Sequence, residues 1–163
     1  MLIIPSLIFG FLSAIFALAI EIAIDLFFSI SLLGALILAG DLDFKTLIFL
    51  LGIAAIEELS KYLFIQLRIK RFPLTLPSAM WKNIILGSSF GIGFAAIEIL
   101  LMFYTSFGFL SLWMALSAAA LHILTSVILT IYFLSFSQKT ATRLSVITLV
   151  ILLHMLYNTI MIF

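Results

Sequence analysis

Long apolar stretches separated by short polar segments make up most of the chain. A helix needs roughly 20 apolar residues to cross a hydrocarbon core about 30 Å thick, because it rises about 1.5 Å per residue. Four stretches reach this length without ambiguity, at residues 45–67, 83–105, 112–136 and 144–163. Each of them predicts a transmembrane helix.

The first forty residues allow two interpretations. They form either one long tilted helix over residues 3–27 or two short spans that turn near Glu21 and Asp25. Because no Gly or Pro lies at 20–25, nothing favours a turn there. We therefore expect one long helix and five spans, with residues 28–40 at the interface or in a sixth span. We assign Glu21 and Asp25 to the solvated end of the first helix.

Composition supports this picture. The chain is 66% hydrophobic and 9% charged, whereas soluble domains are about half apolar and about a quarter charged. The net charge of +1 provides no basic field for nucleic acid. Cysteine is absent, which excludes disulfides, thiolate metal sites and cysteine nucleophiles. We predict an all-α, polytopic transmembrane helix bundle without a soluble domain. It forms a single integral membrane domain over residues 1–163 in the lipid bilayer, with no nucleic-acid partner.

Lys and Arg residues gather in two of the loops between the predicted spans. Residues 68–82 carry four of them and residues 137–143 carry two, and neither loop has an acidic residue. By the positive-inside rule both loops are cytoplasmic. We expect a protein of a prokaryotic cytoplasmic membrane, with its N-terminus in the cytoplasm and its C-terminus outside.

The predicted spans contain side chains that lipid disfavours, since a charge at the bilayer centre costs about 2.5–3.5 kcal/mol. The candidates for catalysis among them are Glu57, Glu58, Glu98, His122, His154 and Asn158. Counted from the cytoplasmic ends, the glutamates at 57 and 98 and both histidines lie roughly 15–22 Å deep. Four helices thus bring a titratable group to mid-membrane, which predicts a reaction site or a pathway.

Two further residues are expected to support this site. Lys61 lies four residues after Glu57, so the two share a helix face and are expected to neutralise each other. Glu58 is rotated from Glu57 by about 100° and need not point the same way. Phe94 lies one turn before Glu98, where its ring can shield the carboxylate.

Each feature also has a purely structural explanation. Glu57 and Lys61 can form a structural ion pair, and the histidines and Asn158 can form hydrogen bonds between helices. The small residues at 87–93 (GSSFGIG) are typical of close helix packing. This explanation accounts poorly for two glutamates and two histidines at one depth.

The polar residues suit two mechanisms of peptide hydrolysis. In one, a glutamate activates a water held between Glu57, Glu98 and a histidine, while His154 and Asn158 stabilise the oxyanion. In the other, zinc binds Glu98, His122 and His154, and Glu57 remains free as the base. An amide is a good oxyanion donor and a poor zinc ligand. We therefore favour a site with no cofactor and keep zinc as the alternative.

Four ordered motifs carry a resemblance to a known family. Residues 57–61 read EExxK, residues 94–98 read FxxxE, His122 stands alone, and residues 154–158 read HxxxN. In this order the chain resembles the PrsW-like intramembrane proteases over about residues 10–160. This family lies within the superfamily of CAAX proteases and bacteriocin-processing proteins, which also contains a scaffold subunit of γ-secretase.

The resemblance implies an intramembrane endopeptidase that cleaves membrane-anchored protein or peptide substrates. It implies that Glu57 activates the water, that Glu98 and His122 position the water or a metal, and that His154 and Asn158 stabilise the oxyanion. PrsW-like members often end in HxxxD, whereas the asparagine here is the CAAX-like choice, which leaves the substrate class open.

Two other functions remain alternatives. The same fold can serve as a non-catalytic membrane scaffold or immunity-type partner. A proton-coupled carrier would also use buried glutamate and histidine. However, a chain of 163 residues without an internal repeat leaves little room for the repeated halves of carriers.

Overall fold

Five long helices make up the described part of the protein. The computed structural model describes residues 3–28, 44–72, 80–105, 109–135 and 140–162. The helices are α1 (Ile3–Phe28), α3 (Phe44–Arg71), α4 (Met80–Thr105), α5 (Phe109–Ser135) and α6 (Thr140–Ile162). No strand occurs within these segments. The predicted all-helical fold is confirmed, and each of the five predicted spans coincides with one helix.

The first helix is continuous. α1 runs for 26 residues without interruption at Glu21 or Asp25, so the prediction of one long helix is confirmed. The apolar stretch at 28–40, which we placed at the interface or in a sixth span, lies outside the described residues apart from Phe28.

Among the described segments, four helices are long and apolar enough to cross a membrane, which makes the chain an integral membrane protein. They contain the segments Ile3–Ile24, Met80–Tyr104, Leu112–Leu134 and Ala141–Met161. α3 has 28 residues but carries Glu57, Glu58 and Lys61 near its middle. Because lipid disfavours charge, this part of α3 needs the other helices around it. Its crossing of the membrane stays a prediction.

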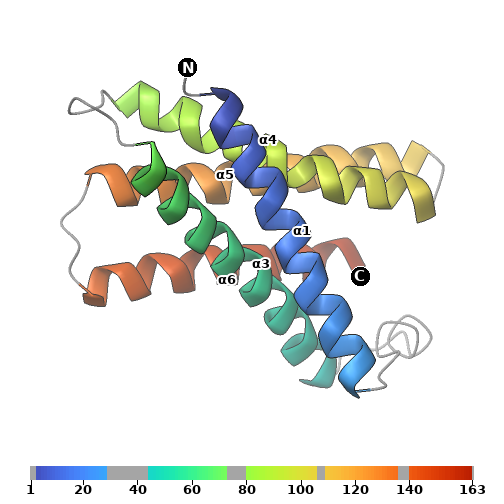
Figure 1. Cartoon of the computed structure of the whole chain (residues 1–163). Coiled ribbons are helices and arrows are strands. Elements are labelled where there is room, and N and C mark those ends of the chain that lie inside the picture. Colours follow the sequence, from blue (N-terminus) through green and yellow to red (C-terminus); the bar gives the residue numbers. More distant parts are fainter. Residues whose placement is uncertain (1–2, 29–43, 73–79, 106–108, 136–139, 163) are drawn as a thin grey trace.

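The five helices pack in a closed ring. α1 lies between α3 and α4, α4 packs on α5, α5 on α6, and α6 returns to α3. Figure 1 shows α4, α5 and α6 running in alternating directions, with α1 and α3 crossing them diagonally. One core cluster joins Ile65, Phe90, Leu129 and Val150, which come from α3, α4, α5 and α6. Polar side chains on the inner faces of these helices are thereby kept away from lipid.

Basic residues lie at one end of the ring. α3 ends with Arg68, Lys70 and Arg71, while Lys82 and Arg143 lie in the first turns of α4 and α6. The end of α3 and the starts of α4 and α6 lie on the same side in Figure 1. The basic residues of both loops thus lie at one end, which the positive-inside rule predicts to face the cytoplasm; this orientation stays a prediction.

Glycines on α4 allow its neighbours to come close. A Cβ atom on Gly91 would lie 2.6 Å from the carbonyl oxygen of His122 on α5. A Cβ atom on Gly93 would overlap the backbone carbonyl of Leu7 on α1. The packing role predicted for residues 87–93 is confirmed. Gly91 also sets how closely His122 approaches α4.

Gly91→Ala should destabilise the bundle, because its methyl group meets backbone that cannot move aside. Overpacking of this kind costs about 1–3 kcal/mol. Gly52→Ala on α3 is the matched control, since nothing lies within 4 Å of the added Cβ. Alanine is the better helix former, so this variant should be as stable as the wild type or more stable. Thermal unfolding in detergent measures both, and equal stability of the two variants would contradict the close contact.

Candidate active site

The side chains singled out at mid-membrane converge inside the ring. Glu57, Glu58 and Lys61 come from α3, and α4, α5 and α6 contribute one residue each, namely Glu98, His122 and His154. Hydrogen bonds and ion pairs join Glu58, Lys61, His122, His154 and Glu98. The predicted convergence in depth therefore corresponds to a cluster in space.

Lys61 pairs with Glu58 and not with Glu57, so our expected pair is wrong. Its Nζ atom donates to Oε1 of Glu58 at 2.6 Å, and both side chains are 0% exposed. Positions three and four residues apart are both within reach on a helix. The surroundings decide between them, because on the Glu58 side Nζ also donates to Thr125 (3.0 Å) and lies 4.6 Å from the ring centre of Phe94.

Glu58 also fixes the orientation of His154. Oε1 of Glu58 lies 2.8 Å from Nδ1 of the buried imidazole. A carboxylate paired with lysine only accepts hydrogen bonds, so Nδ1 carries the proton and donates it. Nε2 of His154 then bears the lone pair. This atom lies 3.6 Å from Oε2 of Glu57.

His122 is held by a carboxylate and by aromatic rings. Its Nε2 atom hydrogen-bonds with Oε2 of Glu98 and lies 3.9 Å from Oε2 of Glu57. The imidazole is fully buried, with its centre 4.7 Å from that of Phe94 and 5.2 Å from that of His154. Phe94 therefore packs against a histidine in addition to lying beside Glu98 as we expected.

Glu57 faces both histidines. Its side chain is 14% exposed, and its Oε2 atom is buried without a hydrogen-bond partner among the described residues. Glu57, His122 and His154 each offer one ligand atom, and these atoms lie within 4.8 Å of one another. Carboxylate oxygen and imidazole nitrogen are zinc ligands, so this group could hold a metal. Our zinc alternative used Glu98 in place of Glu57. In the structure Glu98 contacts one histidine, whereas Glu57 approaches both.

A cavity of about 80 Å³ lies beside Glu57 and is walled by α1, α3 and α4. It has room for several waters. Its lining is Ala14, Ala17, Leu18, Glu21, Glu57, Phe94, Ile97, Glu98 and Leu101. Glu57 and Glu98 thus share one small cavity, and the water expected between them stays a prediction.

Glu21 also lines this cavity, which corrects our assignment of it to a solvated helix end. Because α1 is continuous, residues four and seven apart share a face. Ala14 and Ala17 are buried on α1, so the same face carries Glu21 inward. The signal in the sequence was this spacing between two small residues and a carboxylate.

Asn158 lies apart from the hydrogen bonds of the site. Asn158 is half-buried one turn after His154, and none of the hydrogen bonds described for the site involves it. Its role as an oxyanion donor stays a prediction.

Thr125, which sequence reasoning missed, accepts a hydrogen bond from Lys61 and donates one to the carbonyl oxygen of His122 at 3.4 Å. Its place one turn after His122 was the available signal.

Comparison with known protein families supports this site. Residues 1–163 match the family described as PrsW family intramembrane metalloprotease. Searches of the curated proteins and of the solved structures found no match. The family's description and the Glu57–His122–His154 group favour a metal site over the metal-free site that we expected, with Glu57 in the place that our zinc alternative gave to Glu98. The match extends over the whole chain, which therefore belongs to the PrsW family of intramembrane metalloproteases and is a hydrolase.

Proposed function

We propose that the protein hydrolyses peptide bonds of membrane-anchored proteins with a water activated in the cavity beside Glu57. The observation that carries this proposal is the Oε2 atom of Glu57, which is buried without a hydrogen-bond partner in the described part of the chain and faces both histidines. Leaving a buried acceptor unpaired costs free energy. The presence of such an unpaired carboxylate oxygen between two imidazoles supports a site that binds a reacting group.

The three residues fit a zinc ion. Tetrahedral catalytic zinc takes three protein ligands of the oxygen and nitrogen type and keeps one position open. Glu57, His122 and His154 would supply these ligands, and the bound ion would polarise the scissile carbonyl and make a water more acidic. Nε2 of His122, which hydrogen-bonds with Glu98, is also the atom that would bind the ion, so Glu98 would then be the free carboxylate of the site.

The remaining residues orient the ligands and move the proton. Glu58 accepts the Nδ1–H of His154 and so keeps the lone pair of Nε2 toward Glu57, as carboxylates behind metal-binding histidines commonly do. Glu98 has a side chain that is 29% exposed, and it lines the cavity. It is placed to accept the proton of the attacking water and to return it to the amine that leaves as the C–N bond breaks.

The position of the cavity supports a membrane-anchored substrate. Its walls are α1, α3 and α4, and two of these helices qualify as membrane spans. Glu57 lies near the middle of α3. A scissile bond must therefore reach the site from within the bilayer, which a single-span or lipid-anchored protein can do.

Glu57→Gln should lower cleavage of single-span substrates by at least about 100-fold, the effect typical of losing an acid–base or ligand carboxylate. Glu58→Gln should lower cleavage per folded molecule less, because the amide oxygen still accepts from His154. Since this variant also leaves Lys61 without its buried carboxylate, cleavage is referred to the folded fraction of each variant. Both variants and the wild type are compared after reconstitution with a panel of single-span substrates. Equal cleavage by Glu57→Gln and the wild type would contradict the proposal, and inactivity of the wild type toward every substrate would favour a scaffold.

Metal content separates the roles of Glu57 and Glu98, which both line the cavity. We expect about one zinc per chain, lost from Glu57→Gln and kept by Glu98→Gln, with both variants inactive. Elemental analysis and cleavage assays after chelation and zinc re-addition measure this. If the protein is active without metal and its Glu98→Gln variant still cleaves, Glu57 and not Glu98 is the general base.

Lys61→Met should destabilise the fold by about 3–5 kcal/mol, because it leaves Glu58 as an uncompensated buried charge. Lys45→Met, an exposed lysine on the same helix, is the control and should have little effect. The double variant Lys61→Met with Glu58→Gln should recover much of the loss. Unfolding in denaturing detergent measures all three, and no recovery in the double variant would argue against the pair.

A further inference from the structure

A second, much larger pocket lies at the cytoplasmic end of the seam between α1 and α3. Its volume is about 820 Å³, and it is lined by Phe9, Leu67, Lys70, Arg71 and Phe72. None of these residues lines the cavity beside Glu57. The pocket is therefore separate from the proposed reaction site.

The pocket has an excess of positive charge. Lys70 and Arg71 are exposed, and Arg68 lies buried one turn earlier, donating to Ser6 of α1 at 3.1 Å. No acidic residue occurs at positions 59–97 or before Glu21. Two exposed cations therefore stand at the cytoplasmic end of α3 without an acidic neighbour in these parts of the chain.

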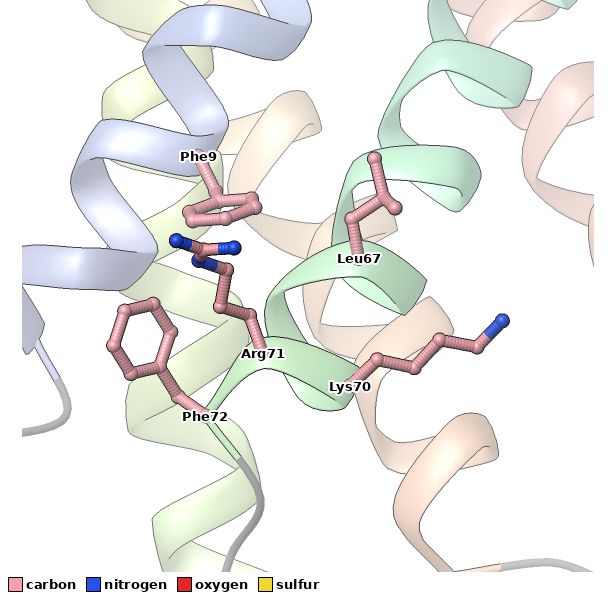
Figure 2. Close-up of a pocket in the computed structure, with 5 residues that line it drawn as sticks. All are labelled: Phe9, Leu67, Lys70, Arg71 and Phe72. Carbon is pink, nitrogen blue, oxygen red and sulfur yellow. The ribbon is translucent and has the colours of Figure 1, made fainter.

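Apolar side chains form the rest of the pocket. The rings of Phe9 and Phe72 meet edge to face with centres 6.3 Å apart, and Leu67 is 43% exposed beside them. Figure 2 shows the Arg71 side chain reaching toward the two rings, whereas Lys70 points away from them. A guanidinium next to an apolar surface suits a ligand that combines a negative group with a hydrocarbon chain.

We propose that this pocket binds an anionic glycerophospholipid of the cytoplasmic leaflet. Its phosphate meets Arg71, because guanidinium groups bind phosphate oxygens in pairs. The start of its acyl chain lies along Phe9 and Leu67, which form the apolar part of the lining. Basic pockets between helices on the cytoplasmic side are suited to anionic headgroups. The proposal does not depend on the hydrolytic mechanism.

The test is retention of lipid by the full chain. Wild type, Arg71→Gln and Lys82→Gln are reconstituted in vesicles of equal phosphatidylglycerol and phosphatidylcholine, and bound lipid is counted by native mass spectrometry. The wild type should retain phosphatidylglycerol in preference to phosphatidylcholine. A basic residue beside an anionic lipid contributes a factor of about five, so Arg71→Gln should retain about fivefold less. Lys82 lies at the same end outside the pocket, and its variant should match the wild type.

The other outcomes overturn the proposal. Unchanged retention in Arg71→Gln would remove the pocket as the binding site. Equal losses of phosphatidylglycerol from Arg71→Gln and Lys82→Gln would indicate that the whole basic end of the bundle attracts the lipid and that the pocket does not bind it. Complete displacement of phosphatidylglycerol by soluble glycerol phosphate would identify a free phosphate as the occupant. Arg71 is exposed, so its replacement should not disturb folding, and Arg71→Lys should recover part of the retention because it keeps the charge.

Discussion

The buried ion pair between Lys61 and Glu58 is the interaction on which the interior of the bundle depends. Each charge alone would be costly inside a membrane protein, and removal of one partner from a buried pair costs about 3–5 kcal/mol. The ammonium also contacts Thr125 on α5 and Phe94 on α4, while Glu58 contacts His154 on α6. One ion pair on α3 therefore connects the four helices that carry the site.

Two neighbouring glutamates consequently have different tasks. Glu58 is fully buried and bound to a lysine and a histidine, whereas Glu57 faces the cavity and both imidazoles. The rotation of about 100° between adjacent helical residues produces this difference. Glu58 holds the histidine in place, and Glu57 remains available to a water or a metal. A site of this kind needs both carboxylates, since one residue cannot satisfy a structural ion pair and stay open to a ligand.

Most of the fold and the membership of the site could be predicted from the sequence. Span length and apolar composition locate the helices, and the common depth of two glutamates and two histidines brings them together. The choice of partner for Lys61 could not be predicted, because Thr125 and His154 come from other helices. The sequence also could not predict which of the two glutamates, Glu57 or Glu98, faces both histidines. Rotations of α3 and α4 about their own axes decide this, and packing sets those rotations.

Glu21 shows a related limit. A carboxylate near the end of an apolar helix is usually solvated, and only the direction of the face that carries Ala14 and Ala17 shows that it points inward. That direction depends on the contacts of α1 with α3 and α4. Spacing along one helix defines a face, but the neighbouring helices decide where the face points.

The placement of both charged partners on α3 also bears on how the chain enters the membrane. α3 is the poorest candidate for insertion, since three charges lie near its middle. Glu58 and Lys61 are one turn apart on the same helix, so they can pair before α4, α5 and α6 have been made. The inserting segment can thus present Glu58 and Lys61 to the bilayer as a neutral pair, which leaves Glu57 as the one charge near its middle that waits for the other helices.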